Sequence, residues 1–380
     1  MAALQSASDP SSDASSDVDV RWRWAPILLV IVAVTALVWF ARDMTFYHDE
    51  WSFILQRDLS IDGLLKPHNE HLSATLVLLY RVLLGTVGMD SYWPYLAVTF
   101  ALHVAVALIV YVVVRREAGE IWALGAMAVV LLLGSGGDDI LWAFQSGTIG
   151  AVAAGMGAVV IAPRRPVIAA VLLTVALATS GAALAFVVGT ALHLLLVRPR
   201  SLVWLAIPAV AYGAWLAAFG ASAIASPHLV GLAEYVATGM NASAAGAVGV
   251  TSLVVGEVVL LALAFGYGWL RSVPRVVGAL LASGLAFFII AGFARAELGP
   301  EQATAPRYVY IVAPSIVIAG AVLLARVRRP AGYALGAFVL AVALVGNVLL
   351  LADTHDRFAT KIVCEGTLTP LERGSAGNPC

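Results

Sequence analysis

The residues best suited to chemistry gather in a polar stretch that follows the first apolar run of the sequence. Its acids and histidines are Asp49, Glu50, His68, Glu70 and His71. A carboxylate can remove a proton from a hydroxyl group, and imidazoles can bind polar substrates. Arg81 lies in the apolar run Leu72–Leu84 that comes next. This run is typical of an amphipathic helix lying at a membrane surface, or of the start of a packed helix.

Two later polar segments add candidates for substrate binding. The first has a glycine-rich turn followed by Asp138, Asp139 and Gln145, and the second leads into Arg307 and Tyr308. The planar guanidinium of Arg307 matches the oxygens of a phosphate group. Each group also has a purely structural interpretation. The paired aspartates could cap a helix, Arg307 could extend to lipid headgroups, and the histidines could be ordinary loop residues.

The composition indicates the elements that must position these residues. Of the 380 residues, 61% are hydrophobic and 12% are charged, whereas soluble domains carry about 25% charged residues. We therefore predict an all-α transmembrane bundle of about 11 helices, each built from an apolar run long enough for a bilayer. The net charge of −1 gives no indication of nucleic-acid binding. The expected spans are 25–41, 93–114, 119–134, 145–162, 166–180, 182–197, 202–220, 248–270, 275–293, 307–326 and 331–352.

The placement of arginines predicts the orientation of the bundle in a bacterial inner (plasma) membrane. With the N-terminus in the cytoplasm, the short arginine-containing loops all face the cytoplasm, as the positive-inside rule requires. Residues 1–24 are then a disordered cytoplasmic tail, 25–352 the transmembrane domain and 353–380 an extracytoplasmic tail. This orientation requires a helix break near Thr179–Gly181, because one continuous helix over 166–197 would move the later arginine loops outside.

The outer face then holds four polar segments, at 42–92, 135–144, 221–247 and 294–306, in addition to the C-terminal tail. Both cysteines of the chain, Cys364 and Cys380, lie in that tail. Cysteines outside the cytoplasm can form a disulfide bond. The sequence leaves two alternatives open, a Cys364–Cys380 bridge or two free thiols.

The order of these motifs resembles that of the GT-C fold glycosyltransferases, polytopic membrane enzymes that use polyprenyl-phosphate-linked sugars. Protein O-mannosyltransferases and bacterial lipid A aminoarabinose transferases are relatives of this type. In that superfamily an acidic motif opens the first outer loop. A segment that contains His and Pro follows this motif, and interfacial helices come next. A second acid lies in the next outer loop, and an Arg-Tyr motif opens a late helix. The matching positions in this sequence are Asp49-Glu50, Pro67–His71, Leu72–Leu84, Asp138 or Asp139, and Arg307-Tyr308 followed by Pro314.

The resemblance implies an inverting glycosyltransferase that moves a sugar from a polyprenyl-phosphate donor to an acceptor on the outer face of the membrane. It implies Asp49 as the general base, with Glu50 beside it, and Arg307 on the donor phosphate. The implied substrate-binding residues are His68, Glu70, His71, Arg81, Asp138, Asp139, Gln145, Arg307 and Tyr308. Membrane lipids are further expected partners, and a divalent cation could bind among these side chains, although no ligand spacing is diagnostic.

Two other classes of protein also fit the sequence. A transporter or flippase for a lipid-linked or small polar substrate would need polar residues near the middle of the membrane. The candidates within the spans are His103, His193 and Glu257. The two histidines are better explained by hydrogen bonds between helices, and Glu257 fits either a functional or a structural role. The third class is a catalytically inactive scaffold of the cell envelope.

Overall fold

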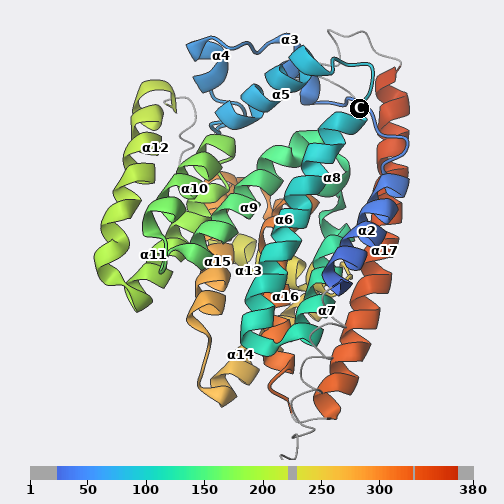
Figure 1. Ribbon diagram of the computed structural model, residues 1–380, viewed down its shortest axis with the longest axis vertical. Coiled ribbons are helices and arrows are strands. Elements are labelled where there is room, and N and C mark those ends of the chain that lie inside the picture. The colour runs from blue at the N-terminus through green and yellow to red at the C-terminus, as the bar shows by residue number, and fades with distance from the viewer. Residues whose placement is uncertain (1–23, 221–228, 328–329, 367–380) are drawn as a thin grey trace, which may run out of the picture.

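The computed structural model describes residues 24–220, 229–327 and 330–366. Over these residues the chain is all-helical, and the only bridge of strand type joins His68 and His71. The long helices run roughly along the longest axis of the molecule, while α3, α4 and α5 cover one end of it (Figure 1). We call this end the α3–α5 end. The predicted all-α helical bundle is confirmed.

In chain order, the helices that make up the bundle are α2 (Ala25–Phe40), α3 (Glu50–Leu55), α4 (Ile61–Leu65), α5 (Ala74–Thr86), α6 (Trp93–Ala118), α7 (Glu120–Leu131), α8 (Gly137–Leu141), α9 (Ser146–Ile161), α10 (Pro166–Thr179), α11 (Ala183–Val197), α12 (Ala206–Phe219), α13 (Leu232–Ala247), α14 (Leu253–Leu270), α15 (Arg275–Arg295), α16 (Pro306–Leu324) and α17 (Ala331–Gly366). Short 3-10 turns connect some of them, including η1 (Gly134–Gly136), η2 (Ala143–Gln145), η5 (Ala296–Leu298) and η6 (Pro300–Thr304).

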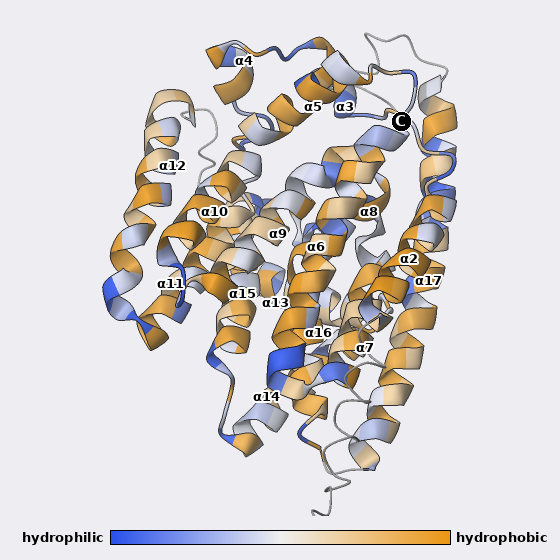
Figure 2. Cartoon of the chain, in the orientation of Figure 1, coloured by the Kyte–Doolittle hydropathy of each residue, from blue (hydrophilic) through white to orange (hydrophobic). Residues whose placement is uncertain are grey.

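Eight helical segments of the described chain are long and apolar enough to cross a membrane. They are Trp93–Ala118, Glu120–Leu141, Ala143–Ile161, Pro199–Phe219, Leu253–Leu270, Arg275–Leu298, Pro306–Leu324 and Ala331–Cys364. Four shorter apolar helices accompany them, and apolar residues dominate along the lengths of the helices (Figure 2). A helix occupies each of the predicted spans, so the structure supports a membrane protein. The number of crossings, about 11, remains a prediction.

The predicted break in the middle of residues 166–197 is confirmed. Helix α10 ends at Thr179, Ser180 is extended, and α11 begins at Ala183. Gly181 lies in this break against the ring of His71, and a Cβ atom at this position would come within 2.5 Å of Nδ1 of His71. The break therefore brings the ends of two short helices against the first polar stretch of the chain.

The prediction of a polar outer segment over 221–247 was wrong for the part that forms helix α13. It packs against α14, α15 and α16, and its small residues are buried along the contact. A Cβ atom at Gly239 would collide with the ring of Phe288, and the neighbouring helix α14 approaches Asn241 at Gly256. Small and weakly polar residues let helices approach closely in lipid, so the composition that resembled a loop is that of a packed helix. Residues 221–228 lie outside the described residues.

Helix α17 also differs from the predicted end of the last span at 352. It continues to Gly366, and Arg357 in the added turns pairs with Asp353 at 3.1 Å and with Asp138 at 2.9 Å. These ion pairs, one of them with the i−4 residue, stabilise helix where a separate tail was expected. Cys364 near its end is disulfide-bonded, whereas Cys380 lies outside the described residues, as do residues 1–23 of the predicted N-terminal tail.

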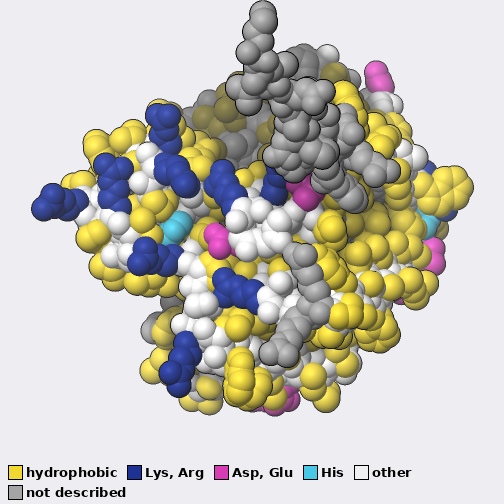
Figure 3. All heavy atoms as spheres, turned by 60° about the horizontal axis from the view of Figure 1, so that its bottom comes forward, with side chains coloured by type: hydrophobic (Ala, Val, Ile, Leu, Met, Phe, Trp, Pro, Cys, Tyr) yellow, Lys and Arg dark blue, Asp and Glu magenta, His cyan; other side chains and the backbone are white. Residues whose placement is uncertain are grey.

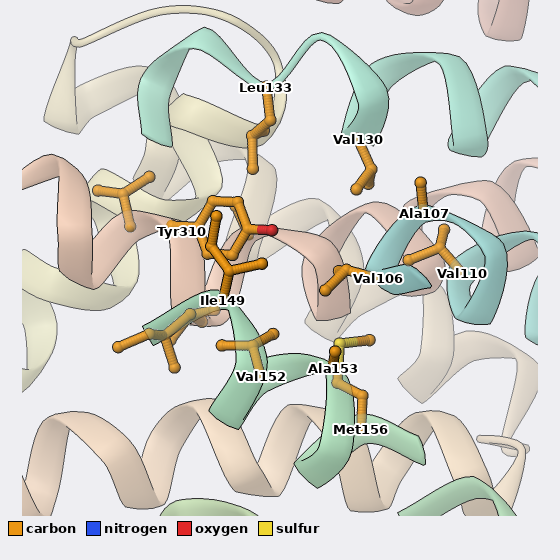
Figure 4. Packing of buried hydrophobic residues seen from close by; sticks show 14 of the residues in the cluster. Val106, Ala107, Val110, Val130, Leu133, Ile149, Val152, Ala153, Met156 and Tyr310 are labelled. Carbon is orange, nitrogen blue, oxygen red and sulfur yellow. The ribbon is translucent and has the colours of Figure 1, made fainter. Parts of the chain in front are cut away.

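The centre of the bundle is a continuous apolar core around Tyr310 of α16 (Figure 4). The Tyr310 hydroxyl donates to Nδ1 of His103 at 2.8 Å, and Nε2 of His103 donates to the carbonyl of Leu131 at 3.2 Å. His193 is bonded to the carbonyl of Val159 at 2.7 Å. The interpretation of both histidines as hydrogen-bonding links between helices is therefore confirmed.

The turn η1 provides a first prediction about stability. Its Ser135 amide donates to the side chain of Asn347 in α17, and a Cβ atom at Gly134 would collide with the Asn347 carbonyl. The new methyl group would meet the Asn347 carbonyl and the Leu351 amide, which are backbone groups and cannot move aside as a flexible side chain could. Gly134→Ala is therefore expected to lower the free energy of unfolding by about 2 kcal/mol. The melting temperature of the purified protein in detergent measures this effect.

The matched control is Gly213→Ala in α12, where nothing lies within 4 Å of the new methyl group. Alanine is the better helix former, so this variant is expected to melt at the same or a slightly higher temperature. Equal melting temperatures for the two variants would contradict the proposed close contact between η1 and α17.

Candidate functional site

A cavity of about 760 Å³ opens at the α3–α5 end of the bundle. Its walls come from the first polar stretch and from the ends of α9, α10, α11, α15 and α16, with Tyr212 of α12 at one side. The polar residues that line it are Asp49, His68, Asn69, Glu70, His71, Ser73, Gln145, Thr148, Thr179, Ser180, Tyr212, Arg295, Glu297, Arg307 and Tyr308. We call this cavity the end pocket.

The end pocket brings together most of the residues that the sequence nominated. Those that line it are Asp49, His68, Glu70, His71, Gln145, Arg307 and Tyr308. Glu50, Arg81, Asp138 and Asp139 are not among the lining residues. Segments that are far apart along the chain therefore place a carboxylate of the first polar stretch and the guanidinium of Arg307 around one cavity.

The segment His68–His71 is a two-residue hairpin that projects its side chains toward the pocket. The His71 amide donates to the His68 carbonyl at 3.0 Å, and the reverse bond measures 2.9 Å. The central residues Asn69 and Glu70 have φ angles of 45° and 71°, as a type I′ turn requires. Arg57 donates to the carbonyls of Lys66 and Pro67 and fixes the chain that enters the turn.

Two arginines meet on Tyr308 at the opposite wall of the pocket. The guanidinium carbons of Arg295 and Arg307 lie 5.8 and 5.2 Å from the centre of its ring, and Arg295 also donates to its hydroxyl. A carboxylate oxygen of Glu70 lies 3.9 Å from the Arg295 guanidinium. Two guanidinium groups near the same ring form a strong site for an anion such as phosphate.

The two histidines of the hairpin are neutral at pH 7. Burial, followed by the positive charges of Arg295 and its neighbours, lowers the pKa of His71 to about 4. Burial also lowers the pKa of His68, against an opposing effect of the Asp49 carboxylate. Each neutral imidazole can donate one hydrogen bond and accept another. These rings are therefore suited to binding hydroxyl groups in the pocket.

Asp49 is one of two carboxylates, with Glu70, that the first polar stretch presents to the pocket. It stands directly before α3, with its side chain 31% exposed and one carboxylate oxygen 3.8 Å from Nε2 of His48. His48 has a φ angle of 48°, which is uncommon for a residue with a side chain. The backbone at this point turns sharply, and this turn directs the adjacent acids Asp49 and Glu50 into different surroundings.

Glu50 is fully buried beneath Asp49 and holds the α3–α5 end together. Its carboxylate accepts hydrogen bonds from the hydroxyls of Tyr80 and Tyr92 at 2.5 and 3.1 Å, from Nε1 of Trp142 at 3.1 Å and from the amide of Tyr47 at 2.9 Å. Tyr80 belongs to α5, Tyr92 directly precedes α6, Trp142 precedes η2 and Tyr47 precedes α3. The predicted catalytic role of Glu50 therefore finds no support in its position, because the side chain has no access to the pocket.

Glu50 leads to a prediction about the pH dependence of stability. Burial raises the pKa of this carboxyl from 4.5 to about 7, although the bonds from Tyr80, Tyr47, Tyr92 and Trp142 limit the rise. The folded protein binds this proton more tightly than the unfolded chain, so the contribution of Glu50 to stability is full below pH 4.5 and falls as pH rises to 7. The loss amounts to about 3 kcal/mol.

The depressed pKa of His71 has the opposite effect, because its contribution is lost as pH falls from 6.5 toward 4. The quantity to measure is therefore the difference in unfolding free energy between the wild type and Glu50→Gln across pH 4.5 to 7.5. We expect the wild type to lose stability relative to the variant as pH rises through this range. A difference that does not change with pH would contradict the raised pKa.

The other nominated residues outside the pocket have identifiable roles or surroundings. Arg81 donates to the carbonyls of Phe53 and Ile54 and so fastens the end of α3 to α5. Asp138 pairs with Arg357 of α17. Asp139 is fully buried, and none of the described residues donates a hydrogen bond to its carboxylate. None of these side chains is placed to contact a substrate in the end pocket directly.

Arg295 and Glu297 are charged pocket residues that the sequence analysis did not nominate. Arg295 contacts the nominated residues Glu70 and Tyr308. It is the last residue of α15, at the start of the polar segment 294–306. An arginine at the outer end of a span usually extends to lipid headgroups, so its type and position did not distinguish it. The informative signal was its spacing from Arg307, since both flank the same short connection between two helices.

Among the described residues, no group of three or more His, Cys, Asp and Glu side chains is arranged to hold a metal ion. No protein-family model, curated protein or solved structure matches this chain. The fold and the pocket by themselves define the class of protein. It is a helical bundle with several helices long and apolar enough to span a membrane, and it has a charged pocket at one end.

Proposed function

We propose that the protein is a membrane glycosyltransferase that transfers a sugar from a polyprenyl-phosphate donor to an acceptor hydroxyl. The observation that carries the proposal is the meeting of Asp49 with Arg295 and Arg307 in one pocket. Glycosyl transfer needs a base for the acceptor and positive charge for the phosphate leaving group. The motif order that resembles the GT-C fold enzymes supports the same function.

The reaction is a single displacement that inverts the anomeric carbon. The acceptor oxygen forms a bond to that carbon while the bond from the carbon to the phosphate oxygen breaks, and the phosphate leaves with the bonding electrons. Asp49 takes the proton of the acceptor hydroxyl. Arg295 and Arg307 stabilise the charge that develops on the phosphate, and the neutral His68 and His71 bind sugar hydroxyls.

The apolar wall of the pocket supports a lipid-linked donor. Phe287, Ile290 and Phe293 of α15 line the cavity together with Leu184 of α11. Ile290 and Phe293 are 37% and 36% exposed, so this wall continues onto the apolar outer surface of the bundle. A polyprenyl chain can lie along this surface in the membrane while its phosphate reaches the arginines.

The charge distribution supports an extracytoplasmic pocket. Arginines gather on the end of the bundle opposite to the pocket (Figure 3). They lie in the last turn of α6, in the connections after α9, α11 and α14, and between α16 and α17, namely Arg115, Arg116, Arg164, Arg165, Arg198, Arg200, Arg271 and Arg326. Because positive loops remain in the cytoplasm, the α3–α5 end faces outward in the plasma membrane.

The test is to incubate the full chain in lipid nanodiscs with radiolabelled polyprenyl-phosphate sugars and candidate acceptors, and then to separate the products. We expect a labelled acceptor and free polyprenyl phosphate in equal amounts. Movement of intact labelled donor across a proteoliposome membrane, without any cleavage, would favour a flippase instead.

The three residues that a transporter could use do not line the end pocket. His103 and His193 form hydrogen bonds between helices, and Glu257 is exposed on α14.

A further inference from the structure

Glu70 occupies a backbone position that glycine would fill at lower cost. It is the second central residue of the type I′ turn, with a φ angle of 71°. Glycine is strongly preferred at this position, because a side chain is crowded by the backbone in the left-handed region. Strained backbone of this kind is concentrated at binding and catalytic sites. The side chain of Glu70 is therefore retained in the turn despite a conformational cost.

The Glu70 side chain extends from the turn toward Arg295. One carboxylate oxygen lies 3.9 Å from a guanidinium nitrogen of Arg295. Arg295 is held from another direction by the hydroxyl of Tyr308, the ring on which Arg307 also lies. The turn itself cannot shift easily, because Arg57 fixes its entry and His71 is packed against Gly181. Glu70 thus stands at a fixed position beside an anion-binding arginine.

We infer that Glu70 is a tethered counter-ion that pairs with Arg295 until a phosphate group binds in the pocket and displaces it. Its carboxylate holds the guanidinium in place before the ligand arrives, and it competes with the ligand for the same hydrogen-bond donors. The inference rests on the proposed function for the choice of phosphate as the anion. Glu70 thereby keeps the affinity of the pocket for phosphate below the value that two arginines alone would give.

A limited phosphate affinity has a consequence for turnover. After transfer the leaving group is a phosphate monoester, which carries more negative charge than the diester of the donor. Repulsion between this product and Glu70 grows with that charge. Glu70 therefore weakens the binding of the product more than the binding of the donor, and it assists release of the lipid phosphate.

The experiment measures phosphate binding to the purified full chain by calorimetry, with inorganic phosphate in one arm and dodecyl phosphate in the other. Glu70→Gln is expected to bind the phosphate about fivefold more tightly than the wild type, because partly exposed ion pairs contribute modest free energies. Arg295→Gln is expected to bind it at least tenfold more weakly. In the Arg295→Gln background, Glu70→Gln is expected to give less than a twofold gain, since its partner is already absent.

Glu301→Gln is the matched control, because Glu301 is exposed on η6 and does not line the pocket. It makes the same change in net charge and is expected to alter phosphate affinity less than twofold. The inference is overturned if Glu70→Gln binds phosphate no more tightly than the wild type, or if its gain persists without Arg295. If Glu70→Gln binds inorganic phosphate more tightly and binds dodecyl phosphate no more tightly, the counter-ion role is supported. The ligand of the pocket is then a soluble phosphate.

These outcomes are separate from the fate of the proposed function, because binding is measured without any transfer. If the phosphate results hold and no sugar acceptor is ever labelled, the glycosyltransferase proposal fails while the counter-ion stands. If transfer occurs and Glu70→Gln leaves phosphate affinity unchanged, the counter-ion fails while the glycosyltransferase stands.

Discussion

Replacing Asp49 by asparagine is expected to lower the rate of sugar transfer about a thousandfold, the typical contribution of a general base. Asparagine has nearly the same shape and cannot take the proton of the acceptor hydroxyl. Because the Asp49 side chain is partly exposed at the pocket wall, the variant is expected to insert in the membrane and melt as the wild type does. Single-turnover transfer with radiolabelled donor measures the effect, and donor binding measured separately should be nearly unchanged.

Asp90→Asn is the matched control for this experiment. Asp90 is exposed in the connection between α5 and α6 and does not line the pocket, so the same chemical change there should leave transfer within about twofold of the wild type. If Asp49→Asn retained normal turnover, another residue would have to serve as the base. The assignment of Asp49 would then be wrong, whatever the fate of the arginines.

Replacing Glu50 by alanine is expected to lower the free energy of unfolding by about 4 kcal/mol. The substitution leaves the buried donors of Tyr80, Tyr92 and Trp142 without their shared acceptor and opens a cavity beneath the pocket. Because these donors come from three separate segments, their loss should loosen the whole α3–α5 end. Tryptophan fluorescence during thermal unfolding in detergent reports the change, since Trp142 is one of the donors.

Two variants separate this effect from a general loss of charge. Glu50→Gln keeps one acceptor oxygen and the side-chain volume, so it is expected to cost less than the alanine variant. Glu117→Ala removes an exposed carboxylate at the other end of α6, and it is expected to change stability by less than about 0.5 kcal/mol. A stable Glu50→Ala protein would show that the hydroxyls find other partners, and it would remove the proposed role of Glu50 in the fold.

Apolar runs and arginine placement were sufficient to predict a helix at each expected span, and also the break at Thr179–Gly181. The failures have physical causes. Helix α13 consists of small and weakly polar residues, and hydropathy alone cannot separate a packed helix of this kind from a loop. The last helix was ended at 352 because apolar character fades there, whereas ion pairs of Arg357 carry α17 further.

The sequence predicted which residues gather at the candidate site better than it predicted the role of each residue. Asp49, Arg307 and one of Asp138 and Asp139 were expected to share a pocket. Asp49 and Arg307 line the same cavity, whereas neither Asp138 nor Asp139 does. Glu50 was placed beside Asp49 in function because the two are adjacent in sequence, yet a turn at His48 directs one to the pocket and buries the other. Residues adjacent in sequence can lie in different surroundings, and only the three-dimensional path of the chain shows which surroundings each residue has.

The end pocket takes Asp49 and Glu70 from near the beginning of the chain and its two arginines from beyond residue 290. A ribosome must therefore deliver the helices from α2 to α15 before either arginine can reach the pocket. If the proposed function holds, a chain truncated before the end of α15 carries the candidate base without the candidate phosphate-binding groups and cannot divert lipid-linked substrates. The candidate site then forms only late in biogenesis.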